Sequence, residues 1–127
     1  MATPNIVNVA TITGITTWKA GINTEAAGVS VIVTNPSSSN KILKVNSLVA
    51  TSIGTTTGVT TKIFNKAAGV GNSVSLGSTM TVPTYSSLAV ISKEMSVYID
   101  EDQSIACFAE GGKGDIDVVC SLEEISL

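Results

Sequence analysis

The sequence lacks histidine and arginine, and its seven basic residues are all lysine. Histidine is the most common general acid or base at neutral pH, so the abundant serine and threonine hydroxyls have no histidine partner to activate them. The formal net charge is −3 at pH 7, and the chain has none of the basic clusters that bind nucleic acid. We therefore expect a protein that is not an enzyme, holds no cofactor and binds no nucleic acid.

Long apolar runs are also missing. The longest are a few residues, whereas a transmembrane helix needs ~20 consecutive apolar residues. Met1–Pro4 lacks the positive charges that begin a secretory signal. The sequence predicts a soluble protein that is made in the cytosol and has no membrane partner.

Aromatic residues make up only 4% of the chain and charged residues only 13%, while valine, isoleucine, threonine and serine dominate. β-branched residues favour strands and small polar residues favour turns. Apolar alternation predicts about eight or nine short strands separated by turns roughly every ten residues. The predicted strands are residues 5–13, 29–34, 41–53, 59–64, 79–83, 87–92 and 95–99, followed by two strands within 103–123.

No stretch shows the 3.6-residue period of a helix, so the predicted fold is all-β. A chain of 127 residues fits one domain, and short strands at this spacing indicate an antiparallel β-sandwich or a jelly-roll-like fold. Residues 1–15 are expected to form an N-terminal arm or strand, and residues 16–127 the sandwich. Residues 41–53, with a bulge near Asn46, are expected to pair with residues 59–64 as a hairpin.

Gln103–Glu123 is predicted to form another hairpin, with Gly111–Gly114 as its turn, because glycine tolerates the positive φ of tight hairpin turns. Strand side chains alternate between faces, so one face of this hairpin is polar except for Ala106, Phe108 and Val119. Phe108 and Val119 form a patch that suits a partner chain. The other face is apolar and is expected to pack on a second sheet: Ile105, Cys107, Ala109, Ile116, Val118, Cys120 and Leu122.

Neither the cysteines nor the acidic residues predict a metal site. Cys107 and Cys120 have no histidine or further cysteine to complete a zinc site. The predicted register places their Cα atoms about 7 Å apart, which is marginal for a disulfide and favours two buried, reduced thiols. Asp100–Asp102 offers three carboxylates, but the spacing is not that of an EF-hand, and a solvated turn is favoured over calcium binding.

Two stretches show no regular period. Residues 14–28 are expected to be an irregular connection or a strand broken at Gly21, with Trp18 in the core rather than at an interface. Asn65–Ser78 is expected to be a long loop, functional or mobile, since such loops are uncommon in compact domains. It lacks the lysine-serine ending and the helix of a phosphate-binding loop.

The N-terminal segment is apolar on both sides of its predicted strand. It either pairs at an edge of its own sheet, which is slightly favoured, or adds a strand to a neighbouring chain through main-chain hydrogen bonds. The residues that we expect to contact a partner are Asn5, Ile6, Val7, Asn8 and Val9, together with Phe108 and Val119.

Three stretches carry a resemblance to a known family. They are MATPNIVNVATITG, TNPSSSNKILKVNSLVATSI and TVPTYSSLAVISKEMSVYIDEDQSIACFAEGGKGDIDVVCSLEEIS, and they span most of the chain. The pattern of a T-N-P turn, a K-V-N-S-L strand, a V-P-x-x-S-S-L pair and a terminal S-L-E-E-I-S resembles small virion structural proteins of tailed bacteriophages, cyanophages above all.

The resemblance implies a β-sandwich virion component, assembled in the host cytoplasm and placed on the capsid surface as a decoration or cement protein. Its partner would be the major capsid protein, whose lattice it stabilises against the pressure of packed DNA. We expect a homo-oligomer, with a trimer favoured. The alternative is a tail, neck or fibre-associated module with a glycan-binding, adhesive role.

Overall fold

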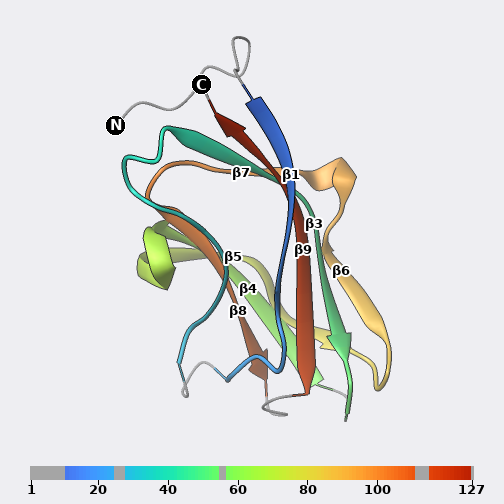
Figure 1. Cartoon of the computed structure of the whole chain (residues 1–127). Coiled ribbons are helices and arrows are strands. Elements are labelled where there is room, and N and C mark those ends of the chain that lie inside the picture. Colours follow the sequence, from blue (N-terminus) through green and yellow to red (C-terminus); the bar gives the residue numbers. More distant parts are fainter. Residues whose placement is uncertain (1–10, 25–27, 55–56, 111–114, 127) are drawn as a thin grey trace.

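A computed structural model describes residues 11–24, 28–54, 57–110 and 115–126 of the chain, and these residues form nine strands and two short 3₁₀ turns (Figure 1). The strands are β1 (Thr11–Lys19), β2 (Ser30–Asn35), β3 (Lys41–Ser52), β4 (Thr57–Lys66), β5 (Val70–Val82), β6 (Ser87–Ile91), β7 (Val97–Ile99), β8 (Gln103–Glu110) and β9 (Ile116–Ser126). The turns are η2 (Ala67–Gly69) and η3 (Lys93–Met95).

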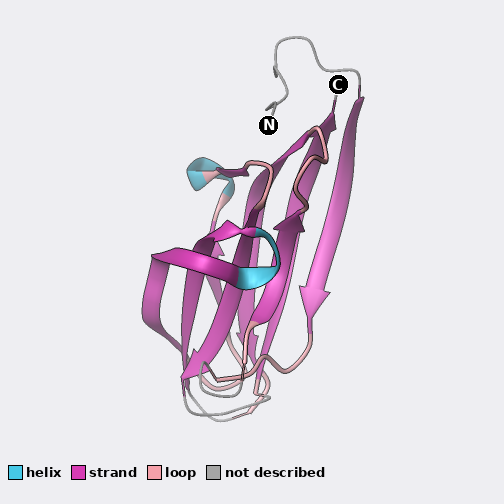
Figure 2. Ribbon diagram, turned by 90° about the vertical axis from the view of Figure 1, so that its left-hand side faces the viewer, coloured by secondary structure: helices cyan, strands magenta, loops and turns pink. Residues whose placement is uncertain are grey.

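The strands form two antiparallel sheets that pack face to face (Figure 2). Sheet A has the order β1-β9-β3-β6, and β7 also pairs with β3. Sheet B has the order β2-β8-β4-β5. The all-β sandwich predicted from the sequence is confirmed. β1 runs without a break from Thr11 to Lys19, so it crosses the expected boundary between residues 15 and 16 and belongs to sheet A.

The core lies between the two sheets and is filled by side chains at alternate positions of their strands, as a half-buried sheet requires. β8 is the most buried strand, since the side chains from Ser104 to Ala109 are all buried, on both faces of the strand. The inward side chains include Val45, Leu48 and Ala50 of β3, Val59 of β4, Ile105, Cys107 and Ala109 of β8, and Ile116, Val118, Cys120 and Leu122 of β9.

The predicted hairpin of β8 and β9 is wrong. β8 pairs with β2 and β4 in sheet B, whereas β9 pairs with β1 and β3 in sheet A. The expected turn, Gly111–Gly114, lies outside the described residues. The inward face was nevertheless predicted correctly, because alternation is a property of each strand and does not depend on which strand is its partner.

The predicted hairpin of residues 41–53 and 59–64 is wrong for the same reason, since β3 lies in sheet A and β4 in sheet B. The predicted bulge is confirmed: the register between β3 and β9 shifts between Val45 and Ser47. Both β3 and β9 are central strands of sheet A, and their pairing extends from Lys41 to Ser52.

The long loop predicted for Asn65–Ser78 is instead the end of β4, the turn η2 and most of β5. η2 lies over the outer face of sheet B and is tied to Ser104 of β8. The Ser104 hydroxyl donates to the Lys66 carbonyl at 2.7 Å and accepts from the Gly69 N–H at 2.8 Å. Gly69 has φ +70°, and a Cβ there would lie 2.5 Å from the Val29 side chain, so this close crossing needs glycine.

Asp102, in the turn before β8, also stabilises the connection between β4 and β5. It accepts hydrogen bonds from the Ala67 N–H at 3.1 Å and the Lys66 ammonium at 3.2 Å. These two donors, the backbone N–H first, hold the pKa of the Asp102 carboxyl below its usual value. Asp102 thus acts as a structural hydrogen-bond acceptor, and the solvated turn expected from the sequence is wrong in part, because the neighbouring Glu101 is buried.

Ile105→Ala should lower the free energy of unfolding by about 2–5 kcal/mol, because the removed side chain is fully buried and leaves a cavity. Ile12→Ala is the matched control. Ile12 is 58% exposed on β1, so the same truncation should cost less than about 1 kcal/mol. Urea unfolding of both variants measures the difference, and equal losses would contradict the described packing.

Ser104→Ala should cost about 1–3 kcal/mol, because it leaves the Lys66 carbonyl and the Gly69 N–H without their buried partner. Ser104→Cys, which keeps a weak donor and acceptor of similar size, should cost less. Hydrogen exchange at Gly69 gives a local readout, and it should accelerate in Ser104→Ala well before global unfolding.

Candidate interaction surface

The residues expected to contact a partner do not come together. Asn5, Ile6, Val7, Asn8 and Val9 lie outside the described residues. Phe108 belongs to sheet B and Val119 to sheet A, so they occupy opposite outer faces of the sandwich. The single patch expected from a hairpin is therefore wrong, because the two strands that carry it are in different sheets.

Phe108 is also not exposed. Only 2% of it is accessible, and it packs with Phe64 and Ala106 on the outer face of sheet B. The ammonium group of Lys62 lies 5.5 Å from the centre of the Phe108 ring, within the range of a cation–π contact. The chain itself covers Phe108, so this side chain is not available to a partner.

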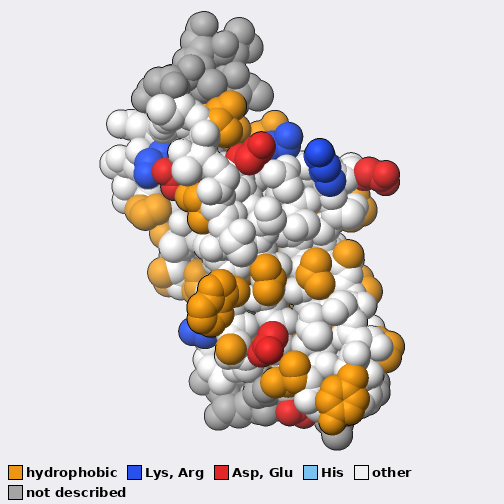
Figure 3. All heavy atoms as spheres, turned by 45° about the vertical axis from the view of Figure 1, so that its right-hand side comes forward, with side chains coloured by type: hydrophobic (Ala, Val, Ile, Leu, Met, Phe, Trp, Pro, Cys, Tyr) orange, Lys and Arg blue, Asp and Glu red, His pale blue; other side chains and the backbone are white. Residues whose placement is uncertain are grey.

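Val119, in contrast, is 47% exposed and lies beside an exposed tryptophan. Trp18 of β1 is its cross-strand neighbour and is 70% exposed, so the expectation that Trp18 is a core residue is wrong. The row continues across sheet A through Val49 of β3 to Ala89 of β6. We call these four residues the apolar row, and Figure 3 shows a band of apolar side chains across the middle of this face.

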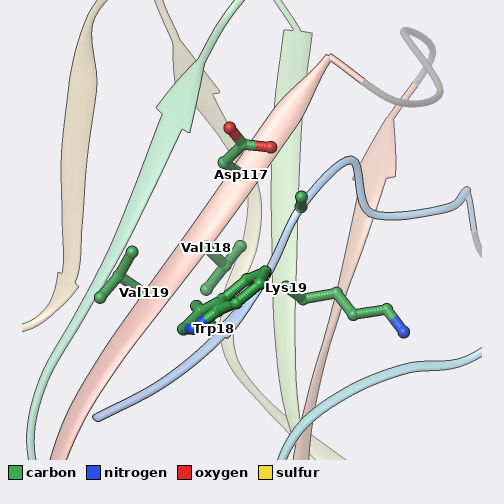
Figure 4. A pocket seen from close by; sticks show the side chains of 6 residues that line it. Trp18, Lys19, Asp117, Val118 and Val119 are labelled. Carbon is green, nitrogen blue, oxygen red and sulfur yellow. The ribbon is translucent and has the colours of Figure 1, made fainter.

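A hollow of about 290 Å³ lies at the tryptophan end of the apolar row (Figure 4). One polar group in it is fixed by the backbone, since Asp117 Oδ1 accepts from the Gly21 N–H at 2.8 Å. The lining residues are Trp18, Lys19, Ala20, Asp117, Val118 and Val119. This set offers a flat aromatic ring and an apolar floor but no nucleophile paired with a base, so its chemistry is that of contact.

Polar rows flank the apolar row on the same face of sheet A. On one side lie Thr16, Ser121 and Ser47, and beyond them Gly14, Glu123, Lys44 and Tyr98. On the other side lie Asp117, Thr51 and Ser87. The hydroxyls of Thr51 and Ser87 are 2.8 Å apart, and Lys44 Nζ lies 4.0 Å from Glu123 Oε2. This part of the face is thus an apolar row bordered by hydroxyls, with one opposite-charge pair.

Cys107 and Cys120 are free, buried thiols that point into the core from opposite sheets. Burial raises the pKa of Cys107 to about 11, although the Thr61 hydroxyl 3.2 Å from its sulfur acts in the other direction. Burial likewise raises the pKa of Cys120 to about 12. Thiols that stay protonated and buried are poor nucleophiles and poor partners for disulfide exchange.

Within the described residues, no three side chains among histidine, cysteine, aspartate and glutamate are grouped to hold a metal ion. The calcium alternative for Asp100–Asp102 therefore has no ligand set in that part of the chain. No helix formed by those same residues is long and apolar enough to cross a membrane.

Comparison with known proteins identifies the fold. No protein-family model matches the sequence, and no curated protein matches it. A solved structure described as "Bacillus endospore appendages form a novel family of disulfide-linked pili" has a chain that superposes with a TM-score of 0.52. The two chains are 17% identical over 92% of this chain and 89% of the other. At this identity, the likeness shows a shared fold.

Sequence reasoning missed the apolar row because its four residues lie on four strands, and the pairing of those strands in sheet A was not predicted. The available signal was Trp18 itself. Treating residues 11–19 as one strand places Trp18 on the opposite parity from Ile15, which is partly buried against the core. Alternation along this strand would then have predicted that Trp18 lies on its outer face.

The native protein should react slowly with Ellman's reagent at pH 8, and unfolding in guanidinium should release two reactive thiols. Fast labelling of the native protein would contradict the described burial of Cys107 and Cys120.

The raised thiol pKa values also predict a loss of stability at high pH. Stability should be fully present below pH 9.0, the ordinary thiol pKa, and fall as pH rises toward 11 to 12, because only the unfolded state then releases protons. A Cys107→Ser, Cys120→Ser double variant should lose this dependence of stability on pH.

Proposed function

We propose that the protein is a structural subunit of a multi-copy assembly, that this assembly is the virion of a tailed phage, and that its role is to decorate and stabilise the capsid. The observation that carries the proposal is the outer face of sheet A. A neutral, apolar row with a 70% exposed tryptophan is a surface that a lone soluble domain gains little from exposing.

The mechanism needs no chemistry. A decoration protein adds buried area across joints between capsid subunits, and many weak contacts become strong when the copies are held on one lattice. A sandwich with two packed sheets is a stiff body for this purpose, because its interior is close-packed and resists deformation. The major capsid protein is the proposed partner, and the sequence resemblance to small virion proteins supports that choice.

A fibre-type role in a tail, neck or appendage is the second candidate, favoured by the shared fold with a subunit of the endospore pili. Those pili are described as disulfide-linked. This chain has two cysteines, and both are buried with raised pKa values. A fibre built from it would therefore be held together without disulfides between its subunits.

The decisive measurement is the position and copy number of the chain in purified particles, obtained by quantitative mass spectrometry and electron cryo-microscopy. A copy number that matches the capsid lattice supports decoration. A small number, equal to a single ring, supports the neck or tail instead. Absence of the chain from purified virions would overturn the virion proposal.

Deletion of residues 2–9 should abolish binding to capsids and leave the fold intact, because the described sandwich begins with β1 at Thr11. Circular dichroism and thermal unfolding check the fold, and co-sedimentation with capsids checks binding. If the truncated protein still occupies capsids at the wild-type level, the N-terminal segment is not the contact strand.

A pair of point variants tests whether that contact uses main-chain hydrogen bonds. Val7→Pro removes an N–H donor and should weaken capsid binding, whereas Val7→Thr keeps the donor and the strand preference and should bind as the wild type does. Equal binding of the two variants would argue against strand addition at this position.

A further inference from the structure

We infer that the outer face of sheet A is a self-complementary interface, on which a second copy of this chain packs face to face about a twofold axis. The axis lies between β9 and β3 and runs parallel to the strands. This inference uses the same face that carries the proposed function, but it concerns the isolated protein and its test needs no virion.

The geometry of the sheet determines which residues would meet. The strand order β1-β9-β3-β6 has β9 and β3 at its centre, and β7 pairs with β3 on the same side as β6. A twofold axis between the central strands places β9 over β3 of the partner copy, and β1 over β6 and β7 of the partner copy. Each row of cross-strand neighbours then packs on the same row of the other copy, with the order of the strands reversed.

The apolar row fits itself in this arrangement. Trp18, the largest side chain of the row, would lie over Ala89 of the partner copy, the smallest. Val119 and Val49, at the centre, would lie over each other across the axis. Large against small is the condition under which two sheet faces interdigitate at the usual spacing of about 10 Å.

A second large-against-small pair occurs in the row that carries the charges. Tyr98 of β7 is 44% exposed and would lie over Gly14 of the partner copy. Gly14 has open space above it, since a Cβ at that position would meet no atom within 4 Å. The two bulky aromatics of the face thus each meet a position without bulk.

The charges of that row are complementary as well. Glu123 would lie over Lys44 of the partner copy, and Lys44 over Glu123 of the partner copy, so the interface gains two opposite-charge pairs. Within one copy these groups are 4.0 Å apart, at the limit of an ion pair, which leaves both able to bind a partner. The polar rows also match, since the carboxylate of Asp117 would face the hydroxyl of Thr51.

The other face-to-face twofold axis, perpendicular to the strands, fits poorly. It would stack Trp18 on Trp18 and bring Glu123 toward Asp115 of the partner copy, which is a like-charge contact. A threefold axis joins two different patches and cannot lay this face on itself. The face therefore predicts a dimer rather than the trimer that was expected from the sequence.

The size of the face sets the expected strength. From Asp117 to Glu123 it is four strands wide, or roughly 400 Å² per copy at strand spacings of about 4.8 Å and rises of about 3.4 Å per residue. The two copies together would bury roughly 800 Å², which is below the standard size of specific interfaces and typical of weak, transient ones. We expect a reversible dimer with a Kd in the micromolar range.

The charge pairs give a test that does not depend on contacts within one chain. Glu123→Lys and Lys44→Glu should each be monomeric in sedimentation velocity, because each homodimer would hold two like-charge contacts. An equimolar mixture of the two variants should form a heterodimer, since both contacts between the copies are then opposite in sign. Within each chain the like charges persist, so rescue by mixing arises only between copies.

Two further variants separate the apolar row from other exposed side chains. Trp18→Ala should raise the dimer Kd at least ~10-fold. Val74→Ala is the control, because Val74 is 73% exposed on β5 of sheet B and its truncation should leave the Kd unchanged.

Three results would overturn the inference. They are a wild-type protein that stays monomeric at millimolar concentration, a mixture of the two charge variants that stays monomeric, and Trp18→Ala with an unchanged Kd. Binding of glycans on an array by the monomer, lost in Trp18→Ala, would assign the hollow beside Trp18 to carbohydrate instead.

Discussion

The structure depends on one constraint, the burial of the inward face of each sheet against the other. Alternate positions of β3, β8 and β9 supply most of this core, and they include fully buried Leu48, Ile105 and Val118. Because these side chains point inward on every strand, the remaining side chains are divided between two outer faces. The chain covers apolar side chains on one of these faces and leaves them exposed on the other, and the candidate interaction surface lies on the exposed one.

The outer face of sheet B is covered by its own chain. The turn η2 is tied over it by Ser104 and Asp102, and Phe108 packs beneath the Lys62 ammonium with Phe64. In sheet A, the corresponding apolar side chains, Trp18 and Val119, stay exposed. The same kind of residue is thus structural on one sheet and available for contact on the other.

The sequence was sufficient to predict the fold class, most strand positions, the bulge in β3 and the inward face of β8 and β9, because alternation is local. Pairing was not predictable in the same way. A glycine-rich connection such as Gly111–Gly114 permits a hairpin and a crossing between sheets equally well, so β8 and β9 were assigned to each other incorrectly. The missed apolar row followed from that error and from the weak pattern around Gly14 and Trp18, in a strand whose one glycine and four threonines hide its regular alternation.

The pairing of β1 with β9 has a mechanical consequence. Thr11 lies opposite Ser126, so the two ends of the described sandwich leave it side by side at one end of the molecule (Figure 1). A force that pulls these ends apart would break the hydrogen bonds between β1 and β9 one pair at a time, because antiparallel hydrogen bonds lie perpendicular to the strands and parallel to that force. A force applied sideways to the broad face of sheet A would instead load four strands together. The sandwich therefore resists force across sheet A better than force that separates its two ends.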